Sequence, residues 1–174
     1  VNRTLGLCGF GKLGTAVAKI GHAFGMKTIA WSQNLTPEKA QAGGAEWVSK
    51  EDLFRRSDIV SVHLVLSERT TNLIGAKEFA LMKQDSIFVN TSRGPIVDEK
   101  ALAEALRNGT IRGAAIDVFE NEPAIETGLM NLENIIMTPH LASATNETRA
   151  KMAELAAENI IAALSGRKPP NLLA

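Results

Sequence analysis

Three closely spaced glycines near the N-terminus constrain the fold of this chain more than any other feature. Residues 7–14 read L-C-G-F-G-K-L-G, so Gly9, Gly11 and Gly14 have the spacing G-x-G-x-x-G directly after a short apolar run. Glycine is common, and the same spacing also occurs in ordinary glycine-rich turns. The pattern predicts a dinucleotide site only where it joins a β-strand to a helix in an alternating α/β chain.

Short apolar runs alternate with helical patterns along the chain. We expect strands at Leu5–Cys8, Thr28–Trp31, Trp47–Val48, Ile59–Leu64, Ser86–Asn90, Ala114–Val118 and Ile135–Met137. We expect helices at residues 13–24, 36–43, 49–56, 76–82, 98–108 and 146–164. Strands joined through helices imply right-handed crossovers and a parallel sheet covered on both faces. The sequence therefore predicts one doubly wound α/β domain of the Rossmann type over residues 1–174.

The glycine motif lies at the junction of the first expected strand and the first expected helix. There Gly9 permits a tight turn, Gly11 lets the backbone approach a pyrophosphate, and Gly14 lets the helix pack closely. The phosphates would then meet the positive end of the helix. The same helix carries Leu13, Val17, Ile20 and Phe24 on one face. We therefore predict binding of NAD or NADP.

The sequence does not decide between NAD and NADP. The residue that contacts the adenosine ribose follows the second strand, where an aspartate would bind both hydroxyls of NAD. This chain has Ser32 there, followed by Gln33 and Asn34, and no arginine is adjacent to attract a 2′-phosphate. These three side chains can form hydrogen bonds to either cofactor.

Charge and composition exclude several classes of partner. The chain has 19 basic and 19 acidic residues, so its formal net charge gives no reason to expect binding of nucleic acid or an anionic membrane. No apolar run approaches the roughly 20 residues that span a bilayer. The single cysteine, Cys8, excludes an internal disulfide and fits a reducing compartment. We expect a cytoplasmic protein and predict no metal site.

Three polar loops follow expected strands. They read N-T-S-R-G-P at residues 90–95, D-V-F-E-N-E-P at residues 117–123, and T-P-H-L-A-S-A-T at residues 138–145. The carboxyl ends of parallel strands form the edge at which open α/β sheets bind ligands. We therefore expect an arginine, a glutamate and a histidine to gather at the edge that holds the nucleotide.

With these loops the sequence resembles the cofactor-binding domain of the D-isomer-specific 2-hydroxyacid dehydrogenases, a family that includes phosphoglycerate and glyoxylate/hydroxypyruvate enzymes. The resemblance runs from about Thr4 to Pro170. Its motifs, in family order, are G-F-G-K-L-G, V-H-L-V-L-S, N-T-S-R-G, D-V-F-E-N-E-P and P-H-L-A-S-A-T. The resemblance implies hydride transfer between a nicotinamide cofactor and a small 2-hydroxy or 2-oxo acid.

The resemblance also implies a role for each residue of a catalytic triad. Arg93 matches the arginine that binds the carboxylate and carbonyl oxygen of the substrate, for which a planar guanidinium is suited. His140 matches the general acid and base. Glu122 matches the carboxylate that is bonded to the other ring nitrogen and orients the imidazole.

Further positions match cofactor contacts. Asp117 matches the residue that orients the nicotinamide carboxamide, and Lys12 and Leu13 match the backbone pair under the pyrophosphate. Other matched contacts are Leu64, Val65, Thr70, Thr91 and Ser92, together with Ser32 and Gln33 at the ribose. The chain departs from the family where Val65 replaces a frequent proline and where Ala142-Ser143 replaces a frequent Gly-Gly. For His63, a place in the cofactor wall and a purely structural role are equally compatible with the sequence.

In this family the substrate-binding domain is discontinuous, and we expect it to be absent from residues 1–174. The chain alone should then bind cofactor and turn over 2-oxo acids poorly or not at all, while the full-length enzyme should be a homodimer. The alternative is a non-catalytic dinucleotide-sensing module of the corepressor type. A formate dehydrogenase is disfavoured, because that branch has glutamine at the position of Glu122. Among other residues, we expect Glu120 to be exposed and Trp47 to pack.

Overall fold

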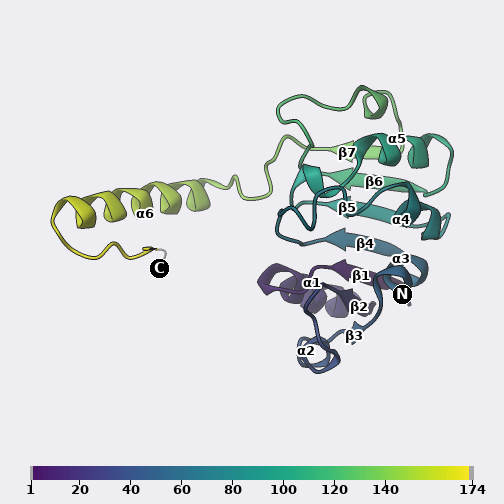
Figure 1. Cartoon of the computed structure of the whole chain (residues 1–174), viewed down its shortest axis with the longest axis horizontal. Helices are drawn as coiled ribbons and strands as arrows, with labels where there is room; N and C mark the ends of the chain where they lie inside the picture. Colours follow the sequence, from purple (N-terminus) through teal and green to yellow (C-terminus); the bar gives the residue numbers. More distant parts are fainter. Residues whose placement is uncertain (1, 173–174) are drawn as a thin grey trace. The chain divides into compact units, whose positions relative to one another are not determined.

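The computed structural model describes residues 2–172, and its elements alternate as expected (Figure 1). The strands are β1 (Thr4–Cys8), β2 (Lys27–Trp31), β3 (Glu46–Trp47), β4 (Ile59–Val62), β5 (Ile87–Asn90), β6 (Gly113–Ile116) and β7 (Ile135–Met137). The α-helices are α1 (Lys12–Ala23), α2 (Pro37–Ala42), α3 (Lys50–Arg56), α4 (Ala76–Leu81), α5 (Glu99–Arg107) and α6 (Asn146–Leu164). Two 3₁₀ turns, η1 (Gly94–Ile96) and η2 (Thr127–Leu129), complete the set.

The chain forms two compact units. The first ends at Pro139 and contains the whole sheet, and the second begins at His140 and contains α6. Within the second unit the segment after α6 turns back along the helix, since the Asn171 amide donates to the Asn159 side chain at 3.1 Å. The expectation that residues 1–174 form one domain stays a prediction.

The sheet has seven strands in the order β3-β2-β1-β4-β5-β6-β7, and every neighbouring pair is parallel. The prediction of a doubly wound α/β fold is therefore confirmed. The strand order reverses direction between β1 and β4, so right-handed crossovers place α1 and α2 on one face and α3, α4 and α5 on the other. In such sheets a crevice opens at the carboxyl end of the reversal point.

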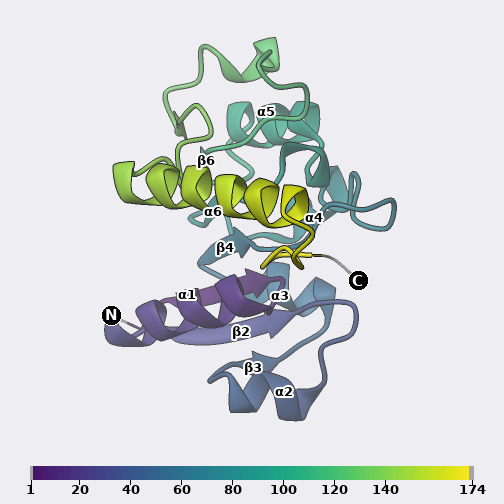
Figure 2. The same ribbon diagram turned by 90° about the vertical axis from the view of Figure 1, so that its left-hand side faces the viewer.

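Helix α1 packs on the sheet through its small residues. Gly14, Ala18 and Gly21 are buried, whereas Leu13 and Phe24 are 71% and 74% exposed. The helix lies alongside β1 and β2 (Figure 2), and a Cβ atom on Gly21 would come within 2.8 Å of a Leu5 methyl. The large apolar face that the sequence shows is therefore not the packing face, because close approach of helix and strand admits only small side chains.

The larger part of the core lies under the helices α3, α4 and α5. It joins Val60 and Phe88 of the sheet to Phe54, Phe79 and Leu102 of these helices. Phe79 and Phe88 meet edge to face, with their ring centroids 5.2 Å apart. Such a pair adds about 0.5–1.5 kcal/mol beyond the burial of its area. This rigid base carries the loops at the carboxyl edge of the sheet.

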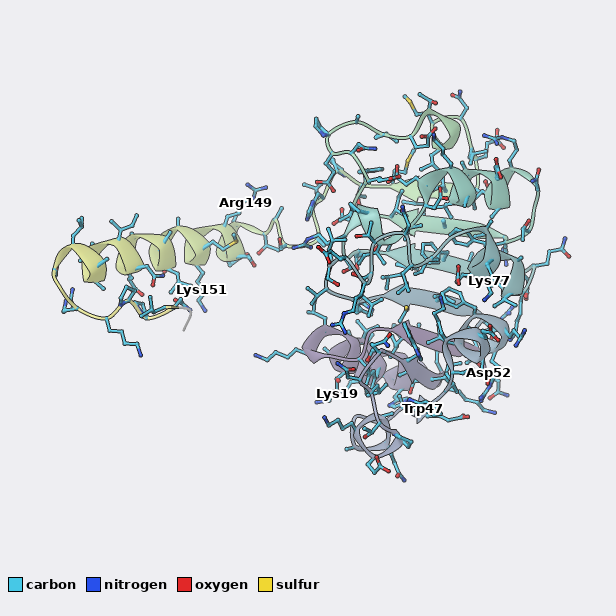
Figure 3. The ribbon with its side chains drawn as sticks, in the orientation of Figure 1. Lys19, Trp47, Asp52, Lys77, Arg149 and Lys151 are labelled. Carbon is cyan, nitrogen blue, oxygen red and sulfur yellow. The ribbon has the colours of Figure 1, made fainter. Side chains whose placement is uncertain are left out.

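Some element ends differ from the expectation. Strand β4 ends at Val62, two residues earlier than predicted, so His63 and Leu64 belong to the loop that follows it. The short strand β3 ends at Trp47, whose side chain is at the surface (Figure 3) and is 42% exposed. The expectation that Trp47 packs was wrong, because β3 is the edge strand and has a neighbouring strand on one side only.

Candidate functional site

In the first unit, a cleft of about 310 Å³ opens at the edge of the sheet formed by the carboxyl ends of its strands. It lies where the strand order reverses, because its lining comes from the segments that follow β1, β4 and β5. The lining residues are Leu13, His63, Leu64, Val65, Leu66, Thr91, Ser92 and Arg93. The structure therefore brings Arg93 to the same cleft as six of the predicted cofactor residues.

The glycine turn between β1 and α1 forms one side of this region. Gly9 has a φ of +104°, and a Cβ atom there would lie 2.5 Å from the His63 carbonyl carbon. A Cβ atom on Gly14 would lie 2.3 Å from the Gly9 oxygen. At Gly14 the start of α1 therefore packs directly against the turn, and at Gly9 the turn packs directly against the segment after β4. A Cβ atom on Gly11, in contrast, would meet nothing within 4 Å, so the backbone there borders open space.

The first turn of α1 is suited to bind an anion. Gly11 is the N-cap, no side chain caps the helix, and no acidic residue lies in its first turn. The first amide N–H groups of a helix lack intrahelical acceptors, and the helix dipole adds partial positive charge at this end. The exposed Lys12 adds a full positive charge. A phosphate group approaching Gly11 would satisfy these donors, so the residues present fit a dinucleotide.

The turn after β2 carries the residues predicted to contact the ribose. The Leu35 amide donates to the Ser32 carbonyl at 3.0 Å, which closes the turn. Ser32 is half-buried, and Gln33 is exposed. The Gly9 amide donates to the Trp31 carbonyl at 2.8 Å, so this turn is tied directly to the glycine turn.

His63 is held on the wall of the cleft by two bonds. Its amide donates to the Cys8 carbonyl at 2.7 Å, and its Nε2 lies 2.9 Å from the Ser61 hydroxyl. Burial lowers the pKa of His63 and so favours the neutral form of its ring. The neighbouring Cys8 is fully buried, and burial raises the pKa of its thiol to about 12. Cys8 is therefore an inert core residue, as its expected place in the strand implies.

Two hydroxyl groups fix the loop between β4 and α4. Thr70 donates to the Val65 carbonyl at 2.8 Å, and Ser92 donates to the Leu64 carbonyl at 2.5 Å. Thr70 also accepts from the Ser67 amide at 2.8 Å. Both residues were predicted to contact cofactor, and both use their hydroxyl protons to hold backbone that lines the cleft.

The loop that carries Arg93 is organised by Asn90, the last residue of β5. The Asn90 side chain accepts from the Ser92 amide at 3.0 Å and donates to the Arg93 carbonyl at 3.1 Å. The Arg93 side chain is exposed and donates to the Ser92 carbonyl at 2.6 Å. A Cβ atom on Gly94 would lie 1.9 Å from the Phe119 carbonyl carbon. The Arg93 loop therefore abuts the loop that follows β6.

That second loop carries Asp117 and Glu122. Asp117 is buried, accepts from the Thr138 hydroxyl at 2.5 Å, and donates its amide to the Asn90 carbonyl at 3.0 Å. Glu122 accepts from the Phe119 amide at 3.0 Å. The expectation that Glu120 is exposed was wrong: it is half-buried, because its amide donates to the buried Glu99.

His140 and Ala142 belong to the second unit. His140 has a φ of +54°, a left-handed conformation that is uncommon outside glycine but is tolerated by histidine. The Ala144 amide donates to the Leu141 carbonyl at 2.9 Å, and Thr145 caps α6 by accepting from the Thr148 amide. The residues from His140 to Ala142 thus lie in the turn that precedes a capped helix.

Sequence reasoning missed three residues that support the site. Asn90 lies in a motif that was noted, but no role was assigned to it, and its place between a strand and a polar loop was the available signal. Ser61 and Glu99 gave no signal, because a serine in a strand and a glutamate at a helix start are both ordinary. In residues 2–172, no group of three or more His, Cys, Asp or Glu side chains could hold a metal ion. Across the same residues, no helix has the length and apolar character needed to cross a membrane.

Comparison with known proteins adds to this geometry. Residues 1–142 match the sequence model of the family described as D-isomer specific 2-hydroxyacid dehydrogenase, NAD binding domain. The chain is 48% identical over 171 residues to a glyoxylate reductase of Thermococcus litoralis, matching 98% of this chain and 52% of that protein. It is 51% identical over 172 residues to a glyoxylate reductase of Aeropyrum pernix, matching 98% of this chain and 51% of that protein.

A solved structure has the same fold. A D-lactate dehydrogenase from Lactobacillus jensenii, solved with NAD+, superposes with a TM-score of 0.86 and 31% identity over 99% of this chain and 56% of that one. The chain thus spans about half the length of the curated relatives it matches.

Proposed function

The chain belongs to the D-isomer specific 2-hydroxyacid dehydrogenase family, and we propose that it is the cofactor-binding part of an oxidoreductase that acts on a small 2-oxo acid or D-2-hydroxy acid. One observation carries the proposal. The glycine turn, the wall of the cleft and the loop of Arg93 meet at the reversal point of the sheet. Dinucleotide-binding α/β proteins bring phosphate, nicotinamide and substrate together at this place.

The cofactor is an NAD-type dinucleotide, in keeping with the matched NAD binding domain. Its pyrophosphate would bind the amides of residues 11–13, and its ribose would face Ser32 and Gln33. His63, Leu64, Val65, Thr91 and Ser92 would form the wall beside it. When bound, the cofactor supplies or accepts the hydride.

Arg93 binds the substrate in this proposal. Its loop is fixed by Asn90 and by the contact of Gly94 with Phe119, so the guanidinium starts from a defined backbone position. A guanidinium fork suits the carboxylate of a 2-oxo acid and can stabilise the negative charge that develops on the carbonyl oxygen. Because several relatives are glyoxylate reductases, we propose glyoxylate or a similar short 2-oxo acid as the substrate of this protein.

His140 donates the proton to the carbonyl oxygen during reduction and removes it during oxidation. Glu122 orients the imidazole and stabilises its charged form. Asp117 would orient the nicotinamide carboxamide of a bound cofactor, and Ala142 would contribute to the nicotinamide site. Thr70 supports the wall by its bonds to the loop after β4. The homodimer of the full-length enzyme stays a prediction.

The test transplants this chain into a complete relative. In the chimera, residues 2–172 replace the matching segment of the Thermococcus litoralis glyoxylate reductase, and NADH oxidation is followed with glyoxylate, hydroxypyruvate and pyruvate. We expect saturable turnover, a loss of about 10²–10⁴-fold for His140→Ala, and normal turnover for Lys151→Ala, which changes a charge on α6. The isolated chain should bind NADH in calorimetry but turn over poorly.

Two results would contradict the proposal. A chimera that binds NADH and has no activity with any 2-oxo acid would favour the dinucleotide-sensing alternative. Full activity of the His140→Ala chimera would show that His140 does not transfer the proton in the reaction.

A further inference from the structure

Glu99, the first residue of α5, is buried under the loop that follows β6. Only 3% of the residue is exposed. Its Oε1 accepts a hydrogen bond from the Glu120 amide at 2.6 Å, and the nearby Glu126 backbone also favours its charged form, which lowers its pKa. None of the ion pairs of the described chain includes it. In the described chain, the carboxylate of Glu99 therefore bonds to backbone rather than to a cation.

The surroundings of Glu99 disfavour its charge. Burial raises the pKa of Glu99, and the nearby charges of Glu120 and Glu126 act in the same direction, while the backbone of these two residues opposes them. Asp98, the N-cap of α5, and Lys100 flank it in the sequence. A buried carboxylate without a cation is costly unless hydrogen bonds compensate it. The bond to the Glu120 amide is therefore the favourable interaction that compensates the burial of Glu99.

The bonded Glu120 amide and the nearby Glu126 backbone lie on either side of Glu122. Glu120 precedes it by two residues, and Glu126 follows it by four. The adjacent Phe119 amide donates to the Glu122 carboxylate, and the Phe119–Glu120 backbone is also the surface on which Gly94 rests. One short backbone segment thus touches Glu99, Glu122 and the loop of Arg93.

We propose that Glu99 is a positioning residue that holds the Phe119–Glu120 backbone in place and thereby fixes both Glu122 and the Arg93 loop. Glu99 contacts neither cofactor nor substrate in this arrangement, and it acts through the backbone of Phe119 and Glu120. The inference rests on the proposed function for the roles of Glu122 and Arg93. The bond between the Glu99 carboxylate and the Glu120 amide, called the clamp below, can be measured without any activity.

The first experiment measures the clamp in the ¹⁵N-labelled chain. Glu99→Gln keeps a carbonyl oxygen but loses the carboxylate charge, so its bond to the Glu120 amide should weaken and the Glu120 amide proton should move upfield. Exchange of the Phe119 and Glu120 amides should accelerate about 10- to 100-fold, the range that a hydrogen bond to a charged group supports. Glu104→Gln, on the exposed side of the same helix, is the matched control and should change neither amide. Unchanged exchange in Glu99→Gln would overturn the proposal.

If Glu99→Gln does not fold, a pH titration of the ¹⁵N-labelled parent chain tests the same bond. The Glu120 amide proton should shift with pH as Glu99 titrates, with a midpoint above that of an ordinary glutamate. A Glu120 amide that is insensitive to pH, or that follows an ordinary glutamate, would contradict the clamp.

The second experiment measures the effect on the reaction. In the chimera, Glu99→Gln should lower kcat about 10-fold or more and change the KM for NADH by a much smaller factor, because the glycine turn is untouched. An unchanged kcat together with accelerated exchange would overturn the positioning role. Failure of the parent chain to bind NADH would instead contradict the proposed function, and the amide measurements would still report on the clamp.

Discussion

The hydroxyl of Ser92 donates a hydrogen bond to the carbonyl oxygen of Leu64 and joins the loop after β5 to the loop after β4. Both residues line the cleft, so this bond fixes the position of the cleft wall. Ser92→Ala should weaken NADH binding about 3- to 10-fold, since a single hydrogen bond contributes about 0.5–1.5 kcal/mol. Calorimetry on the isolated chain checks this, with Ser165→Ala beyond α6 as the control. An affinity equal to that of the parent would show that the bond does not shape the site.

Two glycines of the turn should respond differently to substitution. Gly11→Val adds a side chain where nothing lies within 4 Å, so the free energy of unfolding should change little while NADH affinity falls at least 10-fold. Gly14→Ala places a Cβ atom 2.3 Å from the Gly9 oxygen and should destabilise the chain by about 1–3 kcal/mol. Urea unfolding and NADH titration of both variants separate the effects. Equal NADH affinity in Gly11→Val and the parent would place the phosphates elsewhere.

Ser32 tests the choice of cofactor. Ser32→Asp should raise the ratio of NADH to NADPH affinity about 10-fold or more, because a carboxylate accepts from both ribose hydroxyls and repels a 2′-phosphate. The two affinities are measured by fluorescence titration of the chain, and Ser165→Asp is the control for added charge. If the ratio does not move, Ser32 is not the residue that contacts the ribose.

His63 should make stability depend on pH. Burial lowers its pKa in the folded chain below the ordinary value of 6.5. The unfolded chain therefore binds a proton first as the pH falls, and the free energy of unfolding decreases below about pH 6.5. The contribution is fully present above that pH. His63→Gln should lose less stability than the parent between pH 7.5 and 5.5 in urea unfolding. Parallel losses in the two proteins would contradict burial of the ring.

The sequence alone predicted those parts of the fold that follow from local patterns and from the order of the elements. The spacing of Gly9, Gly11 and Gly14 and the alternation of strands and helices predicted the parallel sheet and the crevice at its reversal point. The packing face of α1 was not predictable from periodicity, because Gly14, Ala18 and Gly21 contact the sheet through their small size rather than their hydrophobicity.

Long-range hydrogen bonds were also outside the reach of the sequence. Ser92 and Leu64 are 28 residues apart, and Glu99 and Glu120 are 21 apart. Neither pair has a local pattern, and each forms only because parallel strands bring their loops to one edge. The polar motifs identified the right loops, but the bonds that hold them required the structure.

The central claim is that this chain binds an NAD-type cofactor at the carboxyl edge of its sheet. A titration of the ¹⁵N-labelled chain with NAD+, followed by amide chemical shifts, tests it directly. We predict saturable shifts concentrated at residues 9–14, 32–33, 63–65 and 91–92. No saturable shifts, or shifts confined to another surface such as the hollow lined by Pro37, Gln41 and Trp47, would contradict it.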